Sequence, residues 1–248
     1  HAHFYYPEYL WKNDEKFPLT GNDGFSGQYT HDVIMTEALK FVRSHREQPF
    51  FLYLPLTIPH YELLVPDDSL EEYRGRFPET PYLGRGPRAG YPRDYAAQAT
   101  PRAALAAMIT RMDRDVGRLL ETLKQNQLDR NTIVFFTSDN GAAQGAADIP
   151  FFDACGPLRG SKGTLYEGGL RVPTIVRWPG KISPGTVSEH VWSFADLLPT
   201  LAELAGTRAP TGLDGLSLVP TLLGETTAGR KQQQHRALYW EYPSRNKP

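Results

Sequence analysis

One stretch of this 248-residue chain combines a long amphipathic helix, a short apolar strand and a polar turn. Residues 101–123 begin with a proline and carry apolar side chains three and four positions apart, which predicts a helix with one buried face. Residues 133–137 are almost wholly apolar, as in a strand that is covered on both faces of a sheet. The polar residues 138–141 follow directly. Helix, buried strand and polar turn in this order indicate an α/β fold.

The same patterns predict the remaining elements. A helix is expected at about 31–47, and a second one from Ser193 to about Ala205, with Gly206 just beyond its end. Strands are expected at 50–56 and 172–178, with shorter ones at 187–192 and 236–242. Together these elements predict a mixed, mostly parallel sheet flanked by helices.

A long connection between two of these elements is rich in proline, glycine and arginine. It covers residues 66–101 and contains Arg74, Arg76, Arg85, Arg88 and Arg93. Such a length is unusual for an ordinary loop. The segment is either an excursion over a binding site, where the arginines meet an anionic substrate, or a solvated surface loop.

Charge and hydropathy exclude two classes of partner. Lys plus Arg number 27 and Asp plus Glu number 28, so the chain lacks the basic field that holds a nucleic-acid backbone. No apolar run approaches the eighteen or so residues that a membrane span requires. The single cysteine, Cys155, excludes an internal disulfide and a cysteine-based zinc cluster.

The turn at Asp139, Asn140 and Gly141 is the first candidate site. Ligands of open α/β sheets bind beyond the carboxyl ends of strands, and this turn follows a strand. A carboxylate beside an amide oxygen offers two hard donors that suit Ca²⁺ or Mg²⁺, and the glycine allows a sharp bend. Taken alone, Asp-Asn-Gly is more often just a tight turn.

A glycine-rich stretch at 156–173 is the second candidate site. Gly160 and Gly163 flank Lys162, which lets a compact positive charge approach an oxyanion closely. The spacing differs from that of a phosphate-binding P-loop. Without further evidence, a solvated surface lysine is the better explanation of this residue.

These motifs closely resemble the type I sulfatases, the arylsulfatase-like branch of the alkaline phosphatase superfamily. The similarity extends over nearly the whole chain from about residue 30, through residues 50–60, 112–117, 137–141, 157–173 and 196–206. It implies an alkaline phosphatase-like fold and a sulfuric ester hydrolase. It also implies one bound Ca²⁺ and a formylglycine nucleophile made from a Cys or Ser.

The resemblance assigns roles to four residues. Asp139 and Asn140 match one pair of the family's calcium ligands, and Lys162 matches its sulfate-contacting lysine. His60, after the predicted strand 50–56, matches the histidine that hydrogen-bonds the sulfate. His60 and Lys162 are thus the expected catalytic and substrate-binding residues, and the expected partner is a sulfated small molecule or glycan.

The sequence departs from the family in what it lacks. An Asp-Asp metal pair and a C/S-x-P-S-R nucleophile motif lie upstream in the family, and neither occurs here. Residues 1–230 are therefore expected to be the C-terminal part of a catalytic domain, with residues 231–248 starting a small C-terminal subdomain. Such a chain is expected to lack turnover and to bind calcium weakly on its own. Because the sequence begins without Met, any secretory signal is expected to lie upstream.

One short pattern imitates the missing nucleophile. Cys155, Pro157 and Arg159 satisfy C-x-P-x-R, the minimal pattern for conversion of cysteine to formylglycine. However, the family's nucleophile lies well before Asp139, so Cys155 is expected to be a small, nonreactive side chain in a loop.

Two other functions remain open at this stage. A phosphodiesterase or phosphonate hydrolase of the same superfamily would bind esters of the same shape and different charge. A non-catalytic binder of sulfated ligands would need the same pocket without the nucleophile. The upstream sequence, together with rates on paired sulfate and phosphate esters, would distinguish the three.

Overall fold

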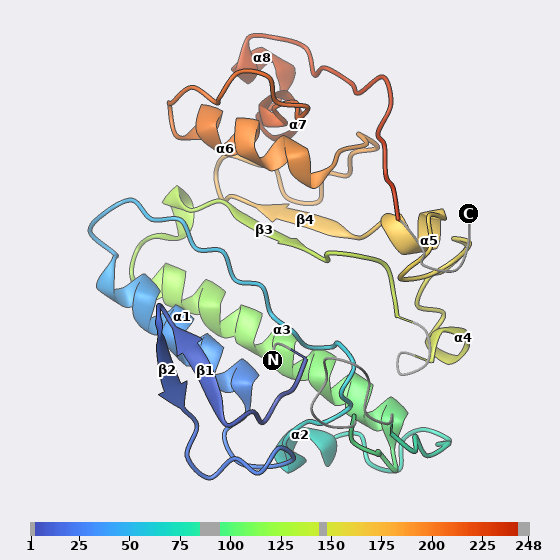
Figure 1. The fold of residues 1–248 in the computed structure, drawn as a ribbon. Helices are drawn as coiled ribbons and strands as arrows, with labels where there is room; N and C mark the ends of the chain where they lie inside the picture. The colour runs from blue at the N-terminus through green and yellow to red at the C-terminus, as the bar shows by residue number, and fades with distance from the viewer. Residues whose placement is uncertain (1–2, 85–94, 144–147, 243–248) are drawn as a thin grey trace. The chain divides into compact units, whose positions relative to one another are not determined.

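The computed structural model describes residues 3–84, 95–143 and 148–242. The chain forms two compact units, shown in Figure 1. Unit 1 comprises His1–Leu128 and Asn140–Leu170, and unit 2 comprises Asp129–Asp139 and Arg171–Pro248. Among the described helices, none has both the length and the apolar character that crossing a bilayer requires.

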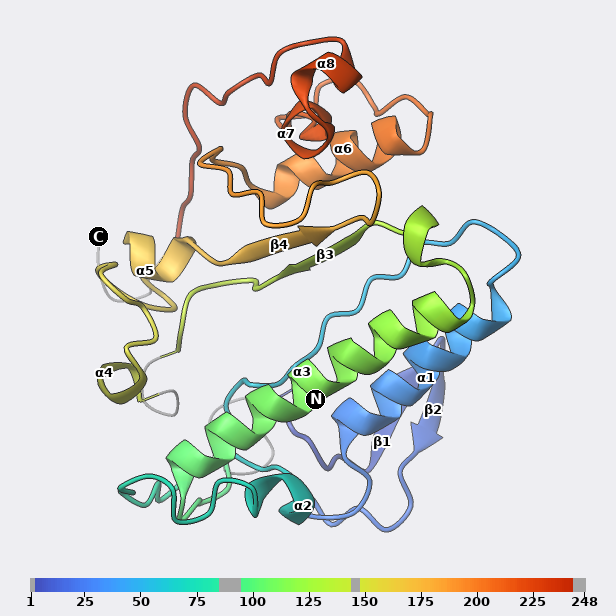
Figure 2. The same ribbon diagram turned by 180° about the vertical axis from the view of Figure 1, so that it is seen from behind.

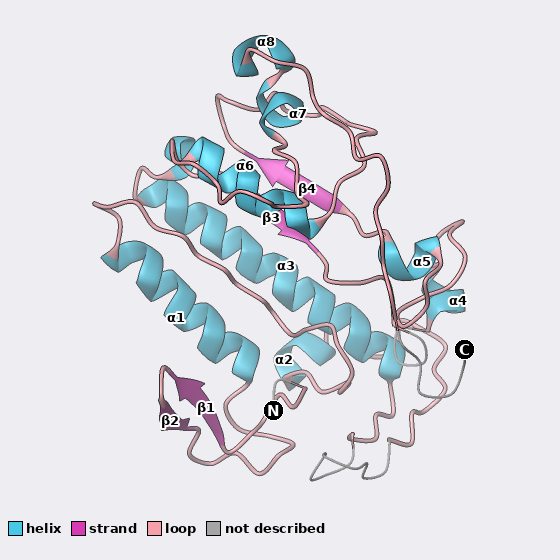
Figure 3. Ribbon diagram, turned by 45° about the horizontal axis from the view of Figure 1, so that its top comes forward, coloured by secondary structure: helices cyan, strands magenta, loops and turns pink. Residues whose placement is uncertain are grey.

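Two long helices form the centre of unit 1. Helix α1 spans Thr30–Ser44 and helix α3 spans Pro101–Gln125, and they lie side by side in Figure 3. Each buries the apolar stripe that its sequence periodicity predicts, as with Met35 of α1 and Met108 of α3. Short helices complete the unit: α2 (Asp67–Leu70), α4 (Ile149–Phe152) and α5 (Glu167–Leu170).

A small hairpin near the N-terminus belongs to the same unit. Strands β1 (Tyr9–Lys12) and β2 (Glu15–Pro18) pair antiparallel, with Tyr9 opposite Pro18 and Lys12 opposite Glu15. The two-residue loop places Asn13 at a φ of 55°, a conformation that asparagine tolerates. Before the hairpin, Tyr5 is fully buried in the apolar core, so the chain's first described residues are held inside unit 1.

Helices α1 and α3 are also joined by buried polar contacts. His31 Nε2 lies 2.9 Å from a carboxylate oxygen of Asp115, and both side chains are almost fully buried. Arg111 donates two hydrogen bonds to Asp32, of 2.8 and 2.6 Å. Burial lowers the pKa of His31 below its usual 6.5, although the Asp115 charge acts in the opposite direction. The folded state therefore holds this imidazole neutral, and acidification below pH 6.5 favours the unfolded chain.

Unit 2 consists of a strand pair and a small helical cluster, which Figure 2 shows from behind. Strand β3 (Val134–Thr137) pairs antiparallel with β4 (Thr174–Arg177), with Val134 opposite Arg177. The other elements are η1 (Asp129–Asn131), η2 (Phe194–Asp196), α6 (Leu197–Leu204), α7 (Val219–Leu223) and α8 (Glu225–Ala228).

A buried carboxylate organises the helical part of unit 2. Asp196 is fully buried and accepts hydrogen bonds from the backbone N–H groups of Ser193, at 2.8 Å, and Leu216, at 2.6 Å. His235 Nε2 lies 2.7 Å from the same carboxylate. Ser193 completes a capping box with Asp196, which confirms the helix start expected at that serine.

Three predicted strands are wrong in the structure. Residues 50–56, 187–192 and 236–242 form no strand, and no described segment pairs with them in a ladder. In the first of these, Phe51 and Tyr53 are 71% and 75% exposed, so it is not covered on both faces. An apolar run favours a strand only where a neighbouring strand accepts its hydrogen bonds. Both described strand pairs are antiparallel, whereas a mostly parallel sheet was expected.

The long connection at 66–101 is partly structured. It contains α2 and an isolated bridge between Tyr82 and Gln98. Arg74 pairs with Glu71 at 2.8 Å on the surface, and Arg76 lies over the ring of Tyr73. These contacts favour an ordinary surface role for both arginines. The other three arginines of this segment lie outside the described residues.

The His31–Asp115 contact leads to a prediction about stability. We expect Asp115→Ala to lower the free energy of unfolding by about 1–3 kcal/mol, because a buried imidazole loses its hydrogen-bond partner. The matched control is Asp113→Ala, an exposed aspartate on the same helix, which is expected to change stability by less than about 0.5 kcal/mol. Urea unfolding of the full-length variants checks this, and equal losses would contradict it.

Candidate functional site

The candidate site in unit 1 is built where two loops are joined through their backbones. The Gly141 N–H donates to the Gly169 carbonyl at 3.0 Å, and the Lys162 N–H donates to the Ala142 carbonyl at 2.8 Å. The backbone of Lys162 therefore lies beside the turn that carries Asn140. The structure thus brings together two residues that are 22 positions apart in the sequence.

Glycines make this close approach possible. A methyl group at Gly141 would overlap the carbonyl oxygen of Gly168. A methyl group at Gly168 would overlap the carbonyl of Gly160, and one at Gly169 would overlap that of Thr164. These are contacts with backbone atoms, which cannot swing away as a flexible side chain does. The glycine-rich sequence is therefore required by packing as well as by any ligand.

His60 lies in unit 1, half-buried, directly after a cis peptide bond between Ile58 and Pro59. Its Nδ1 atom lies 2.8 Å from the Tyr61 carbonyl oxygen. Because a carbonyl only accepts hydrogen bonds, Nδ1 carries the hydrogen. In the neutral state Nε2 then carries no hydrogen.

His3, which was not identified from the sequence, lies beside His60 in the structure. Its ring stacks on the His60 ring, with centroids 4.3 Å apart and an angle of 23° between the planes. The pKa of His3 is lowered from 6.5, first by burial and then by the charges of His60 and Lys162. His3, His60 and Lys162 are therefore close enough to interact electrostatically. No periodicity marks His3, and only its place in the opening His-Ala-His set it apart.

The two predicted metal ligands are consecutive in the chain. Asp139 is exposed at the end of its unit 2 segment, and Asn140 is half-buried in unit 1. The Asn140 amide nitrogen donates to the Gly141 carbonyl at 3.0 Å, so the amide oxygen is directed away from that carbonyl. One carboxylate and one amide oxygen fit a hard cation such as Ca²⁺. They supply only part of the six to eight oxygens that this ion takes.

Another group of possible metal ligands occurs between α1 and α3. One donor atom from each of His31, Asp32 and Asp115 lies within 4.8 Å of the others. However, both oxygens of Asp32 already accept hydrogen bonds from Arg111, and His31 is paired with Asp115. The guanidinium supplies the positive charge that a metal would bring. This group is better explained as the polar contact between the two helices.

Comparison with known proteins identifies the family. A model of the sulfatase family matches residues 2–207. This chain belongs to the sulfatase family. Sulfatases use a metal ion, and the donor chemistry at Asp139 and Asn140 is compatible with one.

Individual sulfatases are similar over most of the chain. Human N-acetylgalactosamine-6-sulfatase is 32% identical over 92% of this chain and 41% of its own length. The solved structure of Ps i-CgsB in complex with a neocarrahexaose is 31% identical, with a TM-score of 0.64 over 82% of this chain and 40% of that one. This chain spans about two-fifths of the length of these two proteins.

A phosphonate monoester hydrolase from Silicibacter pomeroyi shares the fold. Its TM-score is 0.62 over 95% of this chain and 48% of its own, at 22% identity. The α/β, alkaline phosphatase-like fold class expected from sequence is therefore confirmed, as is the family. The domain boundary at residue 231 and the roles of His60, Lys162, Asp139 and Asn140 stay predictions.

The packing at Gly141 makes the second prediction. We expect Gly141→Ala to separate the turn from the Gly168–Gly169 backbone and so to lower activity of the full-length protein by about 100-fold, the cost of misplacing a site by about 1 Å. Gly117→Ala is the control, since nothing lies within 4 Å of the added methyl group and alanine favours the helix by about 1 kcal/mol. Steady-state kinetics check the pair. A fully active Gly141→Ala variant would show that the approach is not needed.

Proposed function

We propose that this chain is part of a sulfatase that hydrolyses sulfuric esters, with a sulfated glycan as the preferred substrate class. The observation that carries the proposal is the grouping of Lys162 and His60 around His3, beside the Asn140 turn, in a chain of the sulfatase family. One cation and two imidazoles suit a tetrahedral oxyanion.

Lys162 is proposed to hold sulfate oxygens. Its flexible stem starts from a backbone fixed to Ala142, so the ammonium group is placed without a cost of loop ordering. As charge moves onto the ester oxygens during S–O cleavage, a fixed positive charge stabilises the transition state more than the ground state.

His60 is proposed to contact the same sulfate through Nε2. The hydrogen bond from Nδ1 to the Tyr61 carbonyl fixes the ring orientation and the tautomer. In the neutral state Nε2 accepts a hydrogen bond, and after protonation it donates one to a sulfate or leaving-group oxygen.

Asp139 and Asn140 are proposed to supply two oxygen ligands to one Ca²⁺. When bound, this ion adds positive charge that binds the sulfate oxygens. The remaining ligands and a formylglycine nucleophile are proposed to come from a segment outside these 248 residues. Cys155 is not proposed as that nucleophile, because it follows Asp139 in the loop that leads to Lys162, whereas the family's nucleophile lies well before Asp139.

The preference for a glycan follows from the similar sulfatases. The human relative is named for N-acetylgalactosamine 6-sulfate, and the solved structure contains a carrageenan-type hexasaccharide. The first name indicates a sulfated sugar, and the second indicates an oligosaccharide ligand. An aryl sulfate remains a convenient test substrate because it shares the sulfate group.

The full-length protein tests the proposal directly. It is expected to release sulfate from sulfated oligosaccharides and from 4-nitrophenyl sulfate, and to act far more slowly on 4-nitrophenyl phosphate and on a phosphonate monoester. Faster turnover of the phosphorus esters would favour the phosphodiesterase or phosphonate hydrolase alternative. Binding of sulfated oligosaccharides without turnover would favour the non-catalytic binder.

The proposed role of Lys162 predicts a selective loss. Lys162→Ala in the full-length protein is expected to lower kcat by about 100-fold to 1,000-fold while the thermal midpoint changes little, because one preorganised charge is lost from a half-buried surface loop. Lys124→Ala, an exposed lysine on α3, is the control and should keep full activity. Wild-type kcat in Lys162→Ala would contradict the role.

The proposed metal ligands predict a loss of calcium affinity. Asp139→Ala and Asn140→Ala are each expected to weaken Ca²⁺ binding by about 10-fold or more, with the larger loss at the charged ligand. Isothermal titration of the chelator-treated full-length protein measures this. The control is Asp115→Asn, in the other group of possible ligands, where an unchanged Ca²⁺ affinity is expected. If that variant alone lost affinity, the ion would bind between α1 and α3 instead.

A further inference from the structure

We propose that His3 is a positioning residue for His60: its imidazole covers one face of the His60 ring and holds that ring where Nε2 meets the substrate. The inference rests on the proposed sulfatase function, because it gives His3 a task in the same pocket. It adds a residue that the sequence motifs do not contain.

The stacking geometry is the first step. The two rings are 4.3 Å apart at their centroids and only 23° from parallel, so they are in face-to-face contact. A ring covered on one face loses part of its freedom to rotate, and water is displaced from that face. His60 is only half-buried, so His3 supplies cover that the core does not.

The segment that carries His3 is itself fixed against His60. The Tyr5 hydroxyl donates to the His60 carbonyl at 2.9 Å, and the Tyr5 N–H donates to a carboxylate oxygen of Glu62 at 3.0 Å. Tyr5 and Glu62 are fully buried. At the other end, His3 Nδ1 lies 3.2 Å from the Tyr95 hydroxyl. His3 is therefore supported both by its own segment and by a residue more than ninety positions away.

The chemistry of the imidazole suits this position. Burial and the neighbouring charges of His60 and Lys162 lower the pKa of His3, so it is neutral near pH 7. It covers His60 without placing another cation beside Lys162. A lysine or arginine at this point would repel both groups.

A double-mutant cycle in the full-length protein tests the coupling. His3→Ala is expected to lower kcat/KM by about 10-fold to 100-fold, and to cause little further loss in a His60→Ala background, because the two residues act through one ring. His3→Phe keeps the stacked face and is expected to recover most of the activity. Independent, additive losses in the cycle would overturn the inference.

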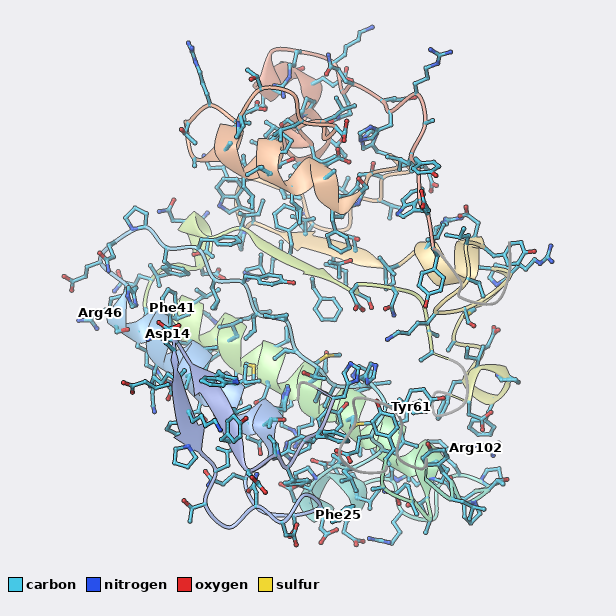
Figure 4. The ribbon with its side chains drawn as sticks, viewed as in Figure 1. Asp14, Phe25, Phe41, Arg46, Tyr61 and Arg102 are labelled. Atoms are coloured by element: carbon cyan, nitrogen blue, oxygen red, sulfur yellow. The ribbon has the colours of Figure 1, made fainter. Side chains whose placement is uncertain are left out.

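The matched control has the same kind of stack elsewhere in unit 1. His45 stacks on Phe41 with centroids 4.1 Å apart and an angle of 25°. Figure 4 labels Phe41 and Tyr61, the neighbour of His60, which lie far apart in the unit. His45→Ala should leave kcat/KM unchanged. An equal loss there would mean that removing any stacked histidine lowers activity through general destabilisation.

A measurement without turnover separates this inference from the proposed function. In full-length protein labelled with ¹⁵N-histidine, the ring nitrogens of His60 report its orientation and tautomer, and the His60→Ala variant assigns them. His3→Ala is expected to shift these signals, whereas His45→Ala should not. Unshifted signals would overturn the inference even in an active sulfatase. If no sulfate ester were hydrolysed, the proposed function would fail, and a changed tautomer of His60 in His3→Ala, which the loss of a neighbouring ring current alone does not produce, would still support a positioning role for His3.

Discussion

The close contact between the Asn140 turn and the glycine-rich loop is the constraint on which the candidate site depends. Two backbone hydrogen bonds join these segments, Gly141 allows them to approach without overlap, and Gly168 and Gly169 allow the glycine-rich loop to fold closely on itself. Because the contact is made by backbone atoms, it fixes the backbone positions from which the side chains of Lys162 and Asn140 extend. A contact between side chains would leave these backbone positions more freedom to move. The placement of Lys162 and Asn140 therefore follows from a packing requirement.

The rest of unit 1 holds the segments that carry His3 and His60. Helices α1 and α3 pack through apolar faces and are aligned by the buried His31–Asp115 pair and by Arg111. The segment before α1 carries Tyr5, which is fully buried and hydrogen-bonded to His60. His3 and His60 are thus attached to the same core as the helices. Buried polar contacts of this kind specify one arrangement, because any alternative would leave polar groups without partners.

Much of the fold and of the candidate site could be predicted from sequence, for a physical reason. Helices α1 and α3 follow from local periodicity, and the start at Ser193 follows from local capping chemistry. Lys162 and the Asp139–Asn140 turn were proposed as site residues because glycine spacing and oxygen donors are visible in a short motif, and their roles stay predictions. In contrast, a strand at 50–56 depends on a partner, and periodicity does not show one. His3 depends on a contact with a residue 57 positions away, which no local pattern encodes.

The charge balance of the pocket bears on the choice between sulfate and phosphate. At neutral pH a sulfate monoester carries one negative charge, whereas a phosphate monoester carries up to two. Lowering the pKa of His3 keeps one of the two stacked imidazoles uncharged near pH 7. Lys162 then supplies a permanent positive charge without a second one from His3 beside it. With the proposed Ca²⁺ left aside, the single lysine charge matches a singly charged sulfate ester, whereas a phosphate dianion would carry one more negative charge to desolvate.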